Sequence, residues 1–305
     1  MRSKNRIIFF GLAFFQTLLS FSQDITIDGG TVKCPAPLAV GYDKTIGPKT
    51  YYVVDLASLQ SVINTGSYDV GAGTVTPTDL SCVCTTQINN MSSLFSGKQS
   101  FNDNISNWDV SNVTNMNNMF NNARAFNQDI SSWDVSNVTA MQQMFQNARS
   151  FNQPLNFTST ENVTNMTYMF WGAEAFNQPL NFDTKNVTNM NNMFGNASNF
   201  NQDISGWNVA NVNDMGSMFE FATSFNQDIS DWDVKKVTNF RNMFANTSNF
   251  NQAIWVWDTS SNTIPGYNRN FTVFFLISSN MLSVHGPYGY PDSNAAAYNG
   301  ADGSW

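Results

Sequence analysis

Residues able to act as catalysts are sparse in this sequence. Its single histidine, His285, lies in a Gly- and Pro-containing tail with no cysteine or paired carboxylate close by. His285 could serve a serine triad, and Glu161 or Glu174 could pair with an aspartate as in a glycosidase. An active site, however, assembles different groups once, whereas this sequence offers the same groups seven times. We therefore expect no enzymatic activity.

The three cysteines allow one disulfide with one thiol left over in an exported chain. We expect Cys34 to pair with Cys82 or Cys84, which would tie the amino-terminal segment to the start of the repeats. The Cys82-Val83-Cys84 group could instead bind a metal or take part in redox chemistry. Its spacing is not Cys-x-x-Cys and no histidine is near, so a structural role is favoured.

Aspartates recur at one position of a repeating pattern, where Thr158 and Asn208 interrupt them. Like charges so close together repel unless amides, water or a cation offset them. Capping of helix amino termini is one interpretation. Calcium bound between adjacent units by Asp109, Asp134 and Asp233 is the other, and no further cofactor is expected. The full set is Asp109, Asp134, Asp183, Asp233 and Asp258.

These residues recur because the chain itself is a repeat. Phe-Asn pairs return every 24 or 25 residues, at Phe101, Phe126, Phe151, Phe176, Phe200, Phe225 and Phe250. A fixed period of this length predicts a solenoid, because one unit cannot bury its apolar residues alone but a stack of units can. We expect a seven-unit solenoid over residues 81–258, preceded by an N-terminal capping segment at 23–80.

Within one unit the apolar spacing changes. Val113, Met116, Met119, Phe120 and Ala123 fall at i, i+3, i+6, i+7 and i+10, which predicts a short helix of about three turns. The stretch 126–135 lacks that spacing and predicts a short strand. The expected fold class is thus an α/β repeat solenoid built from strand-plus-short-helix units of about 25 residues.

A tryptophan column and an asparagine column run along these units. Two units carry Leu155-x-Phe157 and Leu180-x-Phe182 in place of Ile-x-x-Trp, and alternate residues of a strand share one face. The spacing of three breaks that alternation, so either a bulge turns the tryptophans inward or they form an exposed binding strip. Burial is favoured, because phenylalanine replaces tryptophan at the matching position. The tryptophans are Trp108, Trp133, Trp207, Trp232 and Trp257.

The asparagine that follows each phenylalanine forms the second column. If the units stack in register, its amide can bond to the next amide or to free backbone at the bend. A structural ladder is favoured over ligand contact. Its members are Asn102, Asn127, Asn152, Asn177, Asn201, Asn226 and Asn251.

The N-terminal residues and the net charge limit the location of the protein and the partners it could bind. Residues 1–22 read as a secretory signal peptide, with Arg2, Lys4 and Arg6 ahead of an apolar stretch. No later segment is apolar enough for a membrane span, so a secreted or cell-surface location is expected. A net charge of −8 disfavours nucleic acid as a partner.

The stretch "NVTNMNNMFNNARAFNQDISSWDVSNVT" closely resembles the repeat of BspA-like bacterial surface proteins, an atypical leucine-rich-repeat family that is also classed as a repeat domain of unknown function. The resemblance implies a right-handed stack with atypical caps. "TYYVVDLASLQSVINTG" is similar to the usual capping segment, with a short helix at Leu56 to Ile63. In "FTVFFLISSNMLSVHGPYGY", Phe271, Phe274 and Phe275 resemble a degenerate last unit, within a C-terminal cap and tail at 259–305.

Members of that family are secreted or displayed, and some are similar to adhesins. We therefore expect a recognition or adhesion module that binds an extracellular protein or a polysaccharide. A structural spacer or self-associating matrix component is the alternative, and the oligomeric state stays open. The motivating feature is variation at positions outside the core, namely Arg124, Arg149, Glu174 and Ser198, and Ser131, Gly206 and Asp231.

Overall fold

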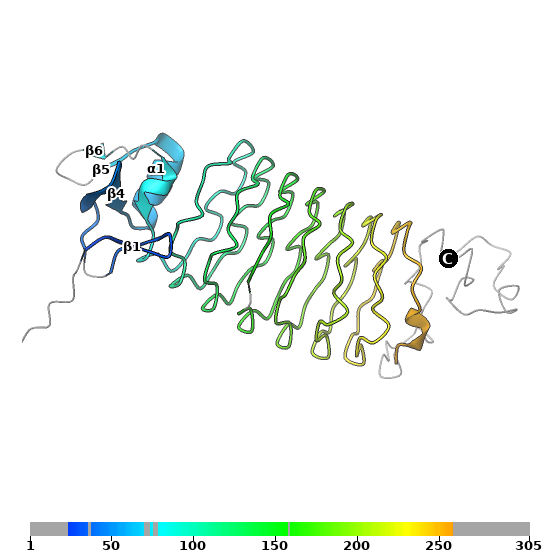
Figure 1. Ribbon diagram of the computed structural model, residues 1–305. Helices are drawn as coiled ribbons and strands as arrows, with labels where there is room; N and C mark the ends of the chain where they lie inside the picture. The colour runs from blue at the N-terminus through cyan, green and yellow to red at the C-terminus, as the bar shows by residue number, and fades with distance from the viewer. Residues whose placement is uncertain (1–23, 36–37, 70–73, 76–78, 158, 259–305) are drawn as a thin grey trace, which may run out of the picture.

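The computed structural model describes residues 24–35, 38–69, 74–75, 79–157 and 159–258. Short strands and one helix form an N-terminal segment, and a row of similar coils follows it toward the C-terminal end (Figure 1). The expected signal peptide at 1–22 and the expected degenerate last unit at 259–305 lie outside the described residues.

The N-terminal segment contains three small sheets. β1 pairs with β2 and β5 with β6, each antiparallel, while β4 pairs antiparallel with β3 and parallel with β7. Because β7 opens the repeat region, this last pairing joins the segment to the coils. The strands are β1 (Thr26–Asp28), β2 (Thr31–Lys33), β3 (Asp43–Ile46), β4 (Lys49–Val53), β5 (Tyr68–Asp69), β6 (Thr74–Val75) and β7 (Val83–Cys84).

The expected helix of the capping segment is present as α1 (Leu56–Thr65). The Asp55 side chain accepts a hydrogen bond from the Ser58 amide, and Gly66 ends the helix in the left-handed conformation at φ 78°. This ten-residue helix is the one α-helix among the described residues, so no described helix is long enough to cross a bilayer.

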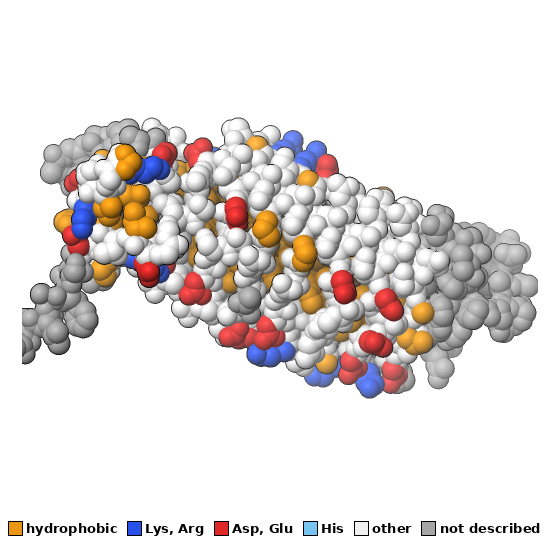
Figure 2. Space-filling view, viewed as in Figure 1, with side chains coloured by type: hydrophobic (Ala, Val, Ile, Leu, Met, Phe, Trp, Pro, Cys, Tyr) orange, Lys and Arg blue, Asp and Glu red, His pale blue; other side chains and the backbone are white. Residues whose placement is uncertain are grey.

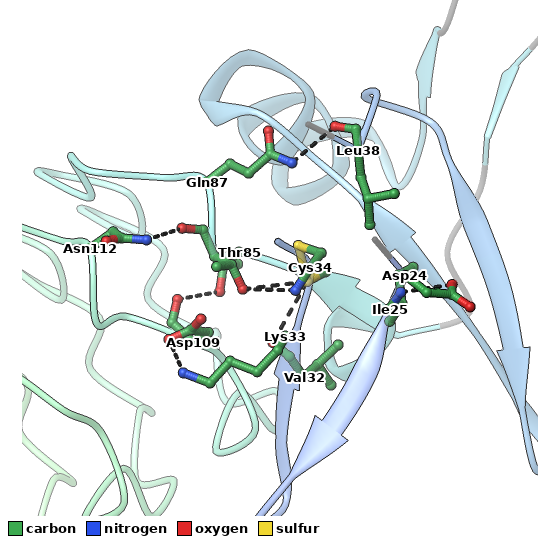
Figure 3. Close-up of a disulfide and its surroundings, with 12 residues drawn as sticks. Asp24, Ile25, Val32, Lys33, Cys34, Leu38, Thr85, Gln87, Asp109 and Asn112 are labelled. Atoms are coloured by element: carbon green, nitrogen blue, oxygen red, sulfur yellow. Dashed lines mark hydrogen bonds and ion pairs between the residues drawn. A yellow bond between two sulfur atoms is a disulfide. The ribbon is translucent and has the colours of Figure 1, made fainter. Parts of the chain in front are cut away.

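Covalent and polar contacts fix the segment to the first coils (Figure 3). Cys34 forms a disulfide with Cys84, and Cys82 lies buried outside that bond. The Val32 amide donates to the Asn107 carbonyl at 2.9 Å, and the Lys33 ammonium contacts Asp109 at 2.9 Å. The 3₁₀-helix η1 (Leu80–Cys82) leads into β7.

The coils are joined to one another by backbone hydrogen bonds. The Phe120 amide donates to the Met144 carbonyl of the next coil, and the Phe145 amide donates to the Met169 carbonyl, each at 2.9 Å. Isolated parallel bridges, such as the one between Asn165 and Asn189, mark the same register. The region is therefore a regular repeat whose coils pair in register through the main chain.

Each coil turns its corners with tandem β-turns, and the expected short helix is absent from the described coils. In the second coil the Met119 amide donates to Met116 and the Ala123 amide to Phe120, at 3.2 and 3.0 Å. The third residue of each turn has φ of 58°, as type II turns require. Both ends of each turn point inward, so the apolar residues repeat at i, i+3, i+4 and i+7 without a helix.

The expected strand at 126–135 is also replaced by a turn. The Trp133 amide donates to the Ile130 carbonyl at 3.1 Å, and both side chains are buried. An Ile-x-x-Trp spacing thus places both residues inward because they are the first and fourth residues of a turn. Leu155 instead forms a parallel bridge with Leu180 of the next coil, and Leu155 and Phe157 both point inward as the alternation predicts.

The interior is one continuous aromatic stack. Phe120 lies 3.9 Å from Phe126 of its own coil and 5.6 Å from Phe145 of the next, centroid to centroid. Phe126 lies 5.7 Å from Phe151, and such pairs repeat from Phe95 to Trp257. Each pair adds about 0.5–1.5 kcal/mol beyond its buried area. The aromatic stack therefore keeps the spacing between successive coils regular.

Candidate binding surface

The tryptophan column is part of the interior. The side-chain exposures of the five residues are between 1% and 7%. Each indole N–H donates to a main-chain carbonyl of the preceding coil, as Trp133 does to Ile105 at 3.3 Å and Trp257 to Ile229 at 3.0 Å. The interpretation of an exposed tryptophan strip is therefore wrong, because the turn geometry directs the rings inward and the backbone satisfies their polar atoms. The column comprises Trp108, Trp133, Trp207, Trp232 and Trp257.

The asparagine column links successive coils by side-chain-to-backbone hydrogen bonds. The Oδ1 atom of each asparagine accepts the backbone N–H of the next one at 2.8–2.9 Å, from Asn102 through Asn226. Glutamine side chains add a second donor in several coils, such as Gln202 to Asn177 at 2.9 Å. Oδ1 of Asn251, in the last described coil, is buried without a hydrogen-bond partner in the described structure. The side-chain oxygens from Asn102 through Asn226 therefore bind the backbone of the next coil.

The aspartate column caps turns. Oδ1 of Asp134 accepts the Ser136 amide at 3.0 Å, and Asp233 accepts the Lys235 amide at 3.3 Å. In the described residues no three His, Cys, Asp or Glu side chains come together as a metal would need. The alternative interpretation, calcium bound by Asp109, Asp134 and Asp233, therefore has no such cluster to support it in the described residues. Helix capping is also wrong for the first four members of the column, because a turn and not a helix follows Asp109, Asp134, Asp183 and Asp233.

Asp109 is the buried member of this column, with 2% exposure. Burial raises the pKa of its carboxyl, but hydrogen bonds from Ser111, Thr86 and Lys33 outweigh burial and hold that pKa below its ordinary value. Figure 3 shows Lys33 reaching Asp109 from the N-terminal segment. Asp109 thus serves the junction between the cap and the coils.

Side chains vary between coils at the corners formed by the tandem turns. We call this surface the tandem-turn face. In each coil it consists of the third residue of each of the two turns and the residue before it. In the second coil these residues are Asn117, Asn118, Asn121 and Asn122. One of its columns reads Asn118, Gln143, Tyr168, Asn192, Ser217 and Asn242. A neighbouring column reads Asn121, Gln146, Trp171, Gly195, Glu220 and Ala245.

The backbone beneath this face is fixed in every coil. The Asn118 amide donates to the Gln142 carbonyl at 2.9 Å, and the Asn122 amide donates to the Gln146 carbonyl at 2.7 Å. The side chains therefore vary while the backbone hydrogen bonds beneath them repeat from coil to coil. Figure 2 shows one side of the molecule, on which white polar groups and backbone predominate and hydrophobic and charged side chains are scattered.

Two aromatic residues on this face adopt backbone conformations that favour asparagine. Tyr168 has φ of 57° and Phe221 has φ of 58°, and asparagine is the commonest residue with positive φ in the coils. Sequence reasoning missed both. The available signal was an aromatic residue interrupting columns that otherwise hold mainly Asn, Gln and Ser.

Four of the positions named from sequence as variable directly follow the second tandem turn, whereas Ser131, Gly206 and Asp231 lie in the separate turns that end at the buried tryptophans. Arg124, Arg149 and Glu174 are exposed, and Ser198 is partly buried. The Arg149 guanidinium contacts the Glu174 carboxylate of the next coil at 3.3 Å, with about half of each side chain exposed. An exposed pair of this kind contributes about 0–1 kcal/mol, so it neutralises charge at the edge more than it stabilises the stack.

A family model described as "Mycoplasma protein of unknown function, DUF285" matches residues 71–182 and 180–272, which is more than half of the chain. The chain belongs to the DUF285 family. The two DUF285 matches together include all of the described coils. A comparison with curated proteins finds no match. The DUF285 description assigns no function, so a functional argument must start from the surface described above.

Proposed function

We propose that the protein is a secreted or surface-displayed recognition module without catalytic activity, which binds an extracellular protein or glycan through the tandem-turn face. The observation that carries this proposal is variation of outward side chains on an otherwise repeated backbone. A rigid surface loses little conformational entropy on binding, so its contacts contribute more fully to affinity. We also propose that the stack is a right-handed, leucine-rich-repeat-like solenoid of the BspA type.

Two features support an extracellular location. The first 22 residues have the charge and apolar pattern of a signal peptide. The disulfide between Cys34 and Cys84 is of a kind that persists in oxidising compartments. Together they favour export followed by display or release.

Binding assays with the chain from residue 23 onward test this proposal. The protein would be immobilised through its C terminus and probed with matrix proteins, cell extracts and a glycan array. Saturable binding that falls when tandem-turn residues are changed supports recognition. Failure to bind any member of these panels at micromolar protein contradicts it.

A further inference from the structure

The fourth and fifth coils carry paired departures from the repeat pattern on the tandem-turn face. Trp171 stands where the preceding coils have Asn121 and Gln146, and Gly195 stands at the same position of the next coil. A Cβ atom built on Gly195 would lie 2.7 Å from Cδ1 and 3.1 Å from Nε1 of Trp171. The indole therefore occupies space that any side chain at 195 would fill. The large side chain of Trp171 and the absence of a side chain at Gly195 are therefore complementary.

A second aromatic ring stands beside the first. Tyr168 and Trp171 have ring centroids 6.3 Å apart and an interplanar angle of 62°, and both side chains are only partly buried. The two rings form an angled, partly solvent-accessible pair. The Trp171 ring lies against Gly195 of the next coil. Tyr168 lies on a turn that the hydrogen bond from the Met169 amide to the Met166 carbonyl closes, so the pair is preorganised.

Tyr168 is placed at some cost to stability. A bulky residue at φ of 57° is disfavoured, whereas asparagine tolerates this region, and Asn192 holds the same position in the next coil. Phe221 repeats the pattern at φ of 58° with 44% of its surface exposed. An exposed aromatic residue in a strained conformation gains little from packing, and strain of this kind clusters at binding sites.

The groups around the rings are uncharged hydrogen-bonding amides. Gln143 donates to Gln146 at 2.8 Å, and Asn192 donates to Asn191 at 2.6 Å. At the edge, Arg149 is already paired with Glu174. Such a surface offers donors and acceptors for hydroxyl groups, and the net charge of −8 disfavours a polyanion.

We propose that Trp171 and Tyr168, supported by Gly195, form a platform on which a pyranose ring of a neutral polysaccharide stacks. The apolar face of a sugar ring packs on an aromatic ring, while its hydroxyl groups bond to neighbouring amides. A protein partner would instead need an interface of roughly 800 Å² per side with an apolar centre. The few rings among amides match a sugar better. This inference rests on the proposed recognition function and names its ligand class.

The test uses native gels cast with mixed-linkage β-glucan, xylan, galactomannan or dextran, run with the chain from residue 23 onward. We expect at least one neutral polysaccharide to retard the wild-type protein. Trp171→Ala removes the platform, and Gly195→Gln installs the residue of an equivalent position and displaces the indole. Each should weaken binding by roughly tenfold or more. Gly206→Ala is the matched control, because a Cβ at Gly206 meets nothing within 4 Å, and it should bind as the wild type does.

A further variant separates binding from folding. Tyr168→Asn restores the residue that the left-handed position favours, so it should raise the urea midpoint while weakening retardation. Loss of binding together with higher stability would not arise from misfolding.

The outcomes distinguish this inference from the proposed function. Retardation that persists in Trp171→Ala and Tyr168→Asn overturns the platform but leaves recognition standing. Retardation by anionic polysaccharides alone, or binding to proteins alone, also overturns the platform. No binding in any panel overturns both.

Discussion

Replacing Asn177 by alanine should destabilise the stack through one identifiable loss. Oδ1 of Asn177 accepts the Asn201 backbone amide and the Gln202 side-chain amide, both at 2.9 Å. A typical hydrogen bond contributes about 1 kcal/mol net, so losing both costs about 2 kcal/mol. The hydrogen bond that the Asn177 backbone amide donates to Oδ1 of Asn152 does not depend on the Asn177 side chain and remains. Because each coil is coupled to its neighbours, the loss weakens the array at its middle.

Urea denaturation followed by tryptophan fluorescence would measure this effect. With an m-value of about 3 kcal/mol/M, a loss of about 2 kcal/mol lowers the midpoint by about 0.7 M. Asn177→Asp keeps an acceptor oxygen and should recover most of the loss.

The same column provides the control. Asn251 occupies the equivalent position, but its Oδ1 has no hydrogen-bond partner in the described structure. Asn251→Ala should therefore change stability by no more than about 0.5 kcal/mol. Equal losses in Asn177→Ala and Asn251→Ala would refute the reasoning, because side-chain acceptance would then not explain the column.

Three further predictions concern the core and the cap. Trp133→Phe leaves the Ile105 carbonyl without its indole donor and should cost about 1–3 kcal/mol in urea denaturation. Cys84→Ser opens a disulfide spanning 50 residues, and the loop-closure estimate gives a loss of about 4 kcal/mol, measured by hydrogen exchange in the N-terminal segment. Because the pKa of Asp109 is lowered on folding, its contribution is present above the unfolded pKa of about 3.9 and is lost as pH falls through the folded pKa. Acid titration of cap stability should therefore show a steeper loss below about pH 4 in the wild type than in Asp109→Asn.

The repeat and its apolar columns could be predicted from sequence, but the local conformation could not. A helix and a pair of tandem turns both bring residues at i, i+3, i+4 and i+7 to one side. Periodicity cannot separate them. Asn118 and Asn122 carried the missing signal, since asparagine tolerates positive φ and is poorly suited to a helix interior.

The proposed binding surface could not be predicted from the repeat pattern. In a stack, recurring residues such as Trp133 make the contacts between coils, so recurrence does not mark a binding position. The partly exposed aromatic residues Trp171 and Tyr168 instead interrupt the repeat pattern. The Gly195 contact depends on the height of one coil above the next, which only the three-dimensional register defines.

Residue-resolved hydrogen exchange tests the in-register stack most directly. Amides at one repeated position each donate to the next coil at 2.9 Å, namely those of Phe95, Phe120, Phe145, Phe170, Phe194 and Phe219. They should all be strongly protected, with the lowest protection toward the ends of the array. Exchange at unstructured rates for the interior members of this set would contradict the stack.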